Sequence, residues 1–116
     1  MNINEVFLVG NLTRDADIRQ SKDGSDYATF TVAVNDRVKR GDEWTDSPNF
    51  IDCVWFRANK LVESLVKGVK VALIGKLHQS SWQKDGQRHS KLEVWVSAID
   101  PMKPKEKQLS DDDLPF

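Results

Sequence analysis

Residues 27–35 are YATFTVAVN and residues 49–57 are NFIDCVWFR, and these two stretches decide the fold class. In the first stretch, the apolar set of alternate positions consists of Ala28, Phe30, Val32 and Val34. In the second stretch, the apolar set consists of Ile51, Cys53 and Trp55. A period of two residues is typical of strands that bury one face, so both stretches are predicted strands.

The flanking sequence predicts further strands and one helix. Residues 5–12, 69–77, 79–83 and 88–99 have the composition of extended segments, and turns are predicted at Asp23–Gly24 and Asp85–Gly86. Residues 59–67 change period, with a stripe of Leu61, Val62, Leu65 and Val66 that ends at Gly68. The polar residues 36–48 are expected to form a long mobile loop.

Three strands, a short helix and two more strands predict an all-β protein. We expect a five-stranded Greek-key barrel of the OB-fold type, with the helix between the third and fourth strands. Closing the sheet into a barrel removes the strand edges that so short a chain would otherwise expose. An SH3-like barrel is the structural alternative, but that fold does not need the helix.

Composition and charge narrow the class of protein. The chain has 116 residues, with 17 Lys and Arg against 18 Asp and Glu. A net charge of −1 excludes a polybasic protein that holds nucleic acid by bulk charge alone. No membrane span or signal peptide is visible, and Cys53 is the single cysteine, so we expect a cytoplasmic protein without a disulfide.

Charge also divides the chain into segments. Residues 1–109 hold 17 basic and 15 acidic side chains, whereas residues 110–116, SDDDLPF, hold three acids and no base. Residues 101–110, PMKPKEKQLS, have too few apolar groups to pack a core. We therefore expect a folded domain over residues 1–100, a flexible linker over 101–109 and a disordered acidic tip over 110–116.

The aromatic residues carry the main functional signal. We expect Phe7, Phe30 and Trp55 to pack in the core. The face of Phe50 and Phe56 also contains Asp52 and is expected to face solvent, and Trp82 lies in the polar hairpin SSWQKDGQRH. Exposed rings on a sheet and a hairpin suit nucleobases, because every base can stack on them whatever the sequence.

Basic residues are interleaved with these exposed rings. They are candidates for phosphate contacts, although any one of them could equally be an ordinary solvated charge. The candidates are Lys39, Arg40, Arg57, Lys60, Lys76, Lys84 and Arg88.

The chain resembles the bacterial single-stranded DNA-binding protein family along nearly its whole length. The stretches that carry the resemblance are NEVFLVGNLTRDADIR (4–19), YATFTVAVND (27–36), NFIDCVWFRANKLVESLVKG (49–68), VALIGKLHQSSWQKDGQR (71–88) and DDDLPF (111–116). The resemblance implies an OB-fold homotetramer, located in the cytoplasm with the nucleoid. It also implies sequence-independent binding and protection of single-stranded DNA in replication, recombination and repair.

The resemblance assigns base stacking to Phe50, Phe56 and Trp82, in agreement with their expected exposure. A further stacking position of the family falls at Val38, which has no ring. Asp52 stands where a basic or neutral residue is expected, and an acid there should weaken phosphate binding locally. The outward face of the last strand carries Trp95, which is consistent with a subunit interface.

The acidic tip has a recognition chemistry of its own. It consists of three acids and an apolar end: Asp111, Asp112, Asp113, Leu114, Pro115 and Phe116. A partner with a hydrophobic pocket and a basic rim could bind both parts, and the resemblance implies replication, recombination and repair proteins as partners. The same acids could compete with DNA for the basic groove. A merely solubilising acidic end is the alternative.

Sequence motifs for catalysis are missing. The two histidines, His78 and His89, belong to no H-E-x-x-H motif, and the chain has no C-x-x-C pair and no P-loop. We therefore expect a non-enzyme without metal or cofactor. Two function classes remain open: a single-strand binder that recruits partners, or an OB-fold primosome or RNA-binding adaptor that acts mainly through protein contacts.

Overall fold

A computed structural model describes residues 1–102 of the chain. Its elements are β1 (Val6–Leu12), β2 (Asp17–Gln20), β3 (Asp26–Arg40), β4 (Glu43–Phe56), the 3-10 helix η1 (Lys60–Ser64), β5 (Lys70–Lys84) and β6 (Gln87–Met102). β6 continues two residues past the predicted domain boundary. The rest of the predicted linker and the whole predicted tip lie outside the described residues.

The strands close into a barrel. They follow the order β1-β5-β6-β4-β3-β2, and β1 also pairs with β3, which joins the two ends of the sheet. Five strands therefore form the closed ring, and β2 is an added strand on the outer edge of β3. The only parallel pairing among the described residues joins β4 to β6, at Cys53–Val94 and Val54–Trp95. The predicted OB-fold barrel is confirmed.

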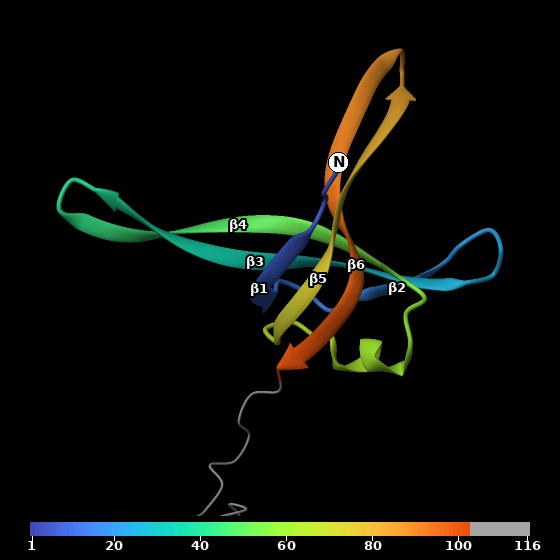
Figure 1. Cartoon of the computed structure of the whole chain (residues 1–116), viewed down its shortest axis with the longest axis horizontal. Helices are drawn as coiled ribbons and strands as arrows, with labels where there is room; N and C mark the ends of the chain where they lie inside the picture. Colours follow the sequence, from blue (N-terminus) through green and yellow to red (C-terminus); the bar gives the residue numbers. More distant parts are fainter. Residues whose placement is uncertain (103–116) are drawn as a thin grey trace, which may run out of the picture.

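Two long hairpins project from the barrel as arms (Figure 1). The β3–β4 arm contradicts the predicted loop at 36–48, because its pairing runs without a shift from Tyr27–Phe56 to Arg40–Glu43. A two-stranded ribbon beyond the barrel exposes both faces, so its sequence shows no apolar alternation. The β5–β6 arm ends at the predicted turn, where Asp85 and Gly86 have φ angles of 54° and 79°, as a tight hairpin turn requires.

The predicted helix is shorter than expected and is of the 3-10 type. It covers Lys60–Ser64, and the Asn59 side chain caps it by accepting a hydrogen bond of 2.8 Å from the Leu61 backbone N–H. Of the four residues in the predicted apolar stripe, only Leu65, which directly follows the helix, is fully buried. Val62 is partly buried against the core, while Leu61 and Val66 remain exposed, so little packing favours a longer helix.

The core lies inside the barrel and includes the predicted Phe30, Cys53 and Trp55. Phe7 was predicted in this core, but its side chain is 67% exposed. The reason is the alternation along β1, in which the neighbours Val6 and Leu8 pack against the core and Phe7 points outward. A run of apolar residues such as VFLV gives no sign of which set faces inward.

The inward set of β6 changes along the strand. Val94 and Val96 are buried, but the next residue that packs against the core is Ile99 and not Ala98, which an unbroken alternation would place inward. Pairing with β5 jumps from Gly75–Val96 to Ile74–Ala98, so Ser97 is an extra residue in a β-bulge. This bulge reverses the alternation and bends β6 around the barrel.

Candidate nucleic-acid interface

A cluster of aromatic rings lies on the outer face of the barrel. The ring of Phe56 packs edge-on against Trp95 at 5.0 Å between centroids, and tilted against Tyr27 at 6.0 Å. On the far side of Trp95, the imidazole of His78 is stacked at 3.6 Å, with 21° between the ring planes. Together these rings form the aromatic cluster, which consists of Tyr27, Phe56, Trp95 and His78.

The strand register explains why these rings meet. Tyr27 pairs directly with Phe56 across β3 and β4, and Val54 lies beside Trp95 in the parallel β4–β6 pair. Lys76 of β5 pairs with Trp95, and its Nζ lies 5.7 Å from the indole centroid. The four rings thus come from four strands, and a predicted phosphate-contact residue lies directly over one of them.

A groove of about 450 Å³ runs beside the aromatic cluster. Tyr27 and Phe56 line it together with three basic side chains, Arg14, Arg19 and Lys91, and two acids, Asp52 and Glu93. Arg14 is held by Asp17 at 3.0 Å in an exposed ion pair. The groove therefore combines flat apolar surfaces with cations, which is the pattern that suits bases and phosphates together.

Asp52 lies in this groove and is paired within the chain. Its Oδ2 is 3.0 Å from Lys91 Nζ, and its Oδ1 accepts a hydrogen bond of 2.8 Å from the Thr31 hydroxyl. Partial burial alone would raise the pKa of Asp52, but the hydrogen bonds from Lys91 and Thr31 outweigh burial and lower the pKa overall. Asp52 is therefore ionised at neutral pH and neutralises Lys91.

The predicted stacking residues occupy three places. Phe56 belongs to the aromatic cluster and is 45% exposed, and Phe50, on the same face of β4, is 66% exposed. Trp82 lies on the β5–β6 arm, where its ring is also 45% exposed and stacks on His89 at 5.8 Å. All three rings are open to solvent, as the sequence predicts.

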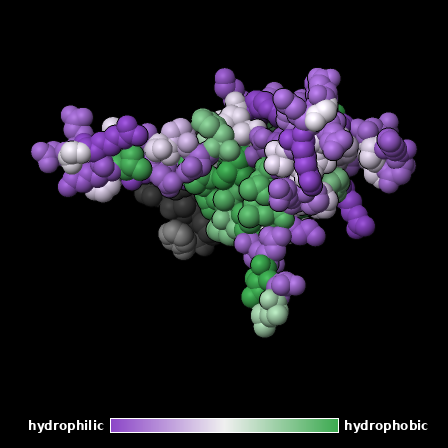
Figure 2. Space-filling view, turned by 90° about the horizontal axis from the view of Figure 1, so that it is seen from above, coloured by the Kyte–Doolittle hydropathy of each residue, from purple (hydrophilic) through white to green (hydrophobic). Residues whose placement is uncertain are grey.

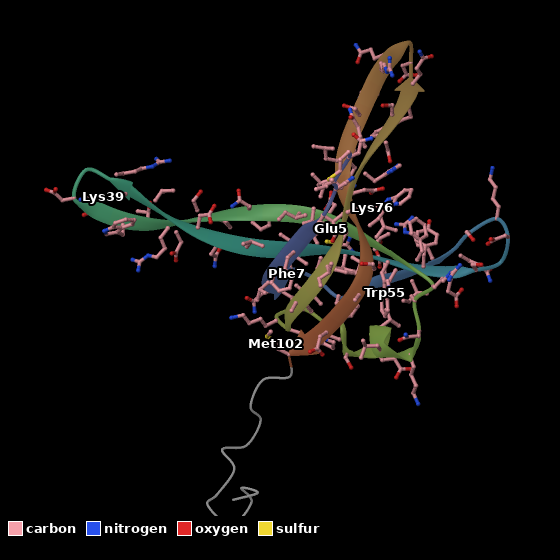
Figure 3. All side chains as sticks on the ribbon, in the orientation of Figure 1. Glu5, Phe7, Lys39, Trp55, Lys76 and Met102 are labelled. Atoms are coloured by element: carbon pink, nitrogen blue, oxygen red, sulfur yellow. The ribbon has the colours of Figure 1, made fainter. Side chains whose placement is uncertain are left out.

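The predicted phosphate-contact residues are distributed around these rings rather than gathered in one patch. Lys39 and Arg40 lie near the far end of the β3–β4 arm, where Figure 3 labels Lys39. Lys84 and Arg88 lie at the far end of the β5–β6 arm, closer to the turn than the cross-strand pair of Trp82 and His89. Lys76 lies over Trp95 of the aromatic cluster, Arg57 follows Phe56 at the end of β4, and Lys60 begins η1.

Sequence reasoning missed several residues of this surface. Tyr27 and His78 were given no binding role, and Trp95 was considered only for an interface, although it packs within its own chain. Arg14, Arg19 and Lys91 were also not selected. Alternation placed Tyr27 and Trp95 on outward faces, but only the register between strands brings them beside Phe56.

The part of the chain that the structure describes offers neither a metal site nor a membrane-spanning helix. Within residues 1–102, no group of three or more His, Cys, Asp or Glu side chains is placed to hold a metal ion. Across the same residues, no helix has the length and apolar character needed to cross a membrane.

The closed barrel and the exposed aromatic side chains define an OB-fold protein whose outer surface can stack the flat rings of a ligand. Residues 3–102 match the single-strand binding protein family, and the chain belongs to that family. It is 43% identical to the single-stranded DNA-binding protein of Treponema pallidum over 100 residues, which cover 84% of this chain and 57% of that relative. It is 38% identical to the protein of the same name from Borreliella burgdorferi over 102 residues, which cover 84% of this chain and 68% of that relative.

Solved structures agree with the fold. The Plasmodium falciparum SSB, in a complex with ssDNA, aligns with a TM-score of 0.79 at 24% identity and covers 89% of this chain and 97% of that one. A deletion mutant of the single-stranded DNA binding protein from Thermus aquaticus aligns with a TM-score of 0.72 at 26% identity, over 87% of this chain and 51% of that one.

Proposed function

We propose that this protein binds single-stranded DNA without regard to sequence. The observation that carries the proposal is the aromatic cluster with Lys76 above it, beside a groove that holds three basic side chains. Stacking on exposed rings stabilises each bound base by about 1–3 kcal/mol and does not depend on which base it is. Duplex DNA keeps its bases stacked on one another, so it cannot use these rings.

Exposed rings at separate places suggest the course of the bound strand. Phe50 and Phe56 are six residues apart on β4, a separation of about 20 Å in an extended strand. One base cannot cover both rings, so the strand would run along β4 and contact each in turn. Trp82 on the β5–β6 arm would then hold another part of the same strand.

Protection of single strands in replication, recombination and repair is the proposed cellular role. It is supported by the names of the bacterial relatives, all single-stranded DNA-binding proteins. The matched stretch spans little more than half of the Treponema relative. The bacterial cytoplasm, at the nucleoid, is the location that this role requires.

We further propose that the chain forms a homotetramer. The support is an apolar area on the barrel, between the polar arms (Figure 2). A second support is the exposed pair Phe7 and Ile74, which line a shallow groove of about 210 Å³ with Ala72, Leu73, Ala98 and Ile99. Exposed rings and aliphatic side chains in one patch are typical of a subunit interface. A mass measurement in solution, with and without a long oligonucleotide, tests the assembly and its stoichiometry.

A titration with oligo-dT and with a duplex of equal length tests the binding function. Quenching of the intrinsic tryptophan fluorescence by oligo-dT, little response to the duplex, and affinity that falls with salt are expected. The variants Phe50→Ala, Phe56→Ala and Trp82→Ala should each weaken binding about fivefold or more. If all three variants bind like the parent chain, these rings are not the stacking site.

The acidic tip, residues 110–116, is proposed to recruit replication, recombination and repair proteins. Its three acids precede an apolar Leu-Pro-Phe end, so one partner surface could bind charge and hydrophobic group together. Removing residues 110–116 should raise the affinity for oligo-dT at low salt if the acids compete with DNA. Unchanged or weaker affinity would reject that competition and leave partner binding as the role to test.

An OB-fold adaptor that acts mainly through protein contacts is the alternative. It predicts weak binding to oligo-dT and no effect of the ring substitutions. The exposed aromatic cluster favours the single-strand binder, because a ring with a cation beside it can hold a base and its phosphate together.

A further inference from the structure

One large exposed ring, that of Trp44, belongs neither to the aromatic cluster nor to the stacking residues Phe50 and Trp82. Trp44 lies on the β3–β4 arm, next to its end, and its side chain is 57% exposed. It is outside the hydrophobic core cluster. A tryptophan outside the core that is more than half exposed leaves a large apolar surface in water, so a ligand that covers the ring would be stabilised.

The register of the arm places Trp44 on the same face as the main site. Pairing between β3 and β4 is unshifted from Tyr27–Phe56 to Arg40–Glu43. Side chains alternate between the two faces of a strand, so Trp44, Phe50 and Phe56 belong to one face of β4. Their partners on β3 are Lys39, Ala33 and Tyr27. The arm twists along its length, as Figure 1 shows, so this face winds around it continuously.

The two faces of the arm beyond Phe50 differ in charge. The face of Trp44 carries two cations and one acid: Arg37, Lys39 and Asp46. The opposite face carries two acids and one cation: Asp36, Glu43 and Arg40. Arg37 and Asp46 pair at 3.9 Å with both side chains well exposed, a weak contact, whereas Lys39 is the direct neighbour of Trp44. A phosphate chain is favoured on the Trp44 face.

We infer that Trp44 is a fourth stacking residue, which with Lys39 extends the single-stranded DNA site to the end of the β3–β4 arm. The inference rests on the proposed function. Trp44 is six residues from Phe50, about 20 Å along an extended strand, so it contacts a part of the DNA that Phe50 and Phe56 do not reach.

Because the ring is remote, its contribution depends on the length of the DNA. Binding of a short oligo-dT of about 8 nucleotides, within the range of a single OB fold, should be unchanged by Trp44→Ala. Binding of an oligo-dT of about 30 nucleotides should weaken about fivefold or more, which is the equivalent of one lost stacking contact. Fluorescently labelled oligonucleotides give the dissociation constants without relying on tryptophan emission.

Two matched variants separate stacking from folding of the arm. Trp44→Phe keeps a ring and should retain most of the long-oligonucleotide affinity. Thr45→Ala alters the neighbouring residue on the opposite face and should bind all lengths like the parent chain. Equal affinity of Trp44→Ala and the parent chain for the long oligonucleotide would overturn the inference, as would an equal loss at both lengths.

The outcome also distinguishes this inference from the proposed function. A parent chain that does not bind oligo-dT, or that is insensitive to Phe50→Ala and Phe56→Ala, rejects the single-strand site itself. Sensitivity to those two substitutions, together with indifference to Trp44→Ala, rejects only the extension along the arm.

Discussion

The phenyl ring of Phe56 packs edge-on against the indole of Trp95, with ring centroids 5.0 Å apart and ring planes at 81°. This geometry is favourable for two aromatic rings and is worth about 0.5–1.5 kcal/mol beyond the area it buries. Because Trp95 is itself stacked on His78, the exposed Phe56 is supported from behind by a fixed surface. A bound base then meets a ring that is already ordered.

Trp95→Ala should weaken binding of oligo-dT by about two- to tenfold, because Phe56 must then be immobilised by the DNA itself. The dissociation constant measures the effect, and circular dichroism checks the fold. Tyr27→Phe, which keeps its ring beside Phe56, is the control and should bind normally. In a double-mutant cycle, Trp95→Ala should add little to Phe56→Ala. Full additivity would mean that Trp95 binds DNA directly.

Asp52→Asn should strengthen binding of oligo-dT at low salt. The substitution frees Lys91, now paired with Asp52 at 3.0 Å, to contact phosphate in the groove. One more neutralised phosphate should steepen the dependence of log affinity on log salt by about 0.7. Asp26→Asn removes the same charge outside the groove and serves as the control. Weaker binding by Asp52→Asn alone would show that the carboxylate orients Lys91 instead.

Asp52 also makes the stability of the fold depend on acid pH. Its pKa in the folded chain lies below the ordinary value of 3.8, so its pairing is fully present above that pH and is lost as pH falls through the lowered pKa. The pair is half exposed, so its contribution to the free energy of unfolding is at most about 1 kcal/mol. Urea unfolding between about pH 5 and pH 2 should show a smaller loss for Asp52→Asn than for the parent chain. Identical pH profiles would contradict this role.

The thiol of Cys53 should be unreactive in the folded protein. Burial raises its pKa to about 12, and the nearby charges of Asp52 and Glu93 act in the same direction. The thiolate is the reactive form, so a thiol reagent at about pH 8 should react slowly with native protein and rapidly after unfolding in guanidinium. Rapid reaction of the native chain would show that the barrel opens at β4.

Gly75→Ala should destabilise the barrel by about 1–3 kcal/mol. A Cβ at this position would collide with the backbone carbonyl of Trp95 on β6, and backbone atoms inside a barrel cannot move aside easily. Gly75 also lies at the β-bulge, where the pairing with β6 shifts between Ile74 and Gly75. Chemical denaturation measures the loss, and Gln79→Ala, at an exposed position of the same strand, is the control. Equal stability of Gly75→Ala and the parent chain would mean that β5 and β6 can separate without cost.

Local sequence chemistry was sufficient to predict several parts of the fold. Alternation of apolar residues correctly assigned Phe30, Cys53 and Trp55 to the core. It also left Phe50 and Phe56 on the open face, because a strand period of two needs no knowledge of the partner strand. The turn at Asp85–Gly86 was equally predictable, since few residue pairs tolerate two positive φ angles.

Where the side chains on the two faces of a segment are alike, the sequence does not show which face is buried or whether the segment is a strand. Val6–Leu12 is apolar almost throughout, so the outward position of Phe7 could not be read from it. The β3–β4 arm is polar on both faces, so residues 36–48 resembled a loop. Pairing with another strand decides both cases, and that information is not local.

What the sequence determined by itself was therefore the five strands of the barrel, the turn at Asp85–Gly86 and the outward position of Phe50, Phe56 and Trp82. What only the tertiary structure decided was which side chains meet. Tyr27, Phe56, Trp95 and His78 come from four strands. Their contact depends on closure of the barrel and on a register set between strands, because a shift of one residue would turn each ring to the opposite face.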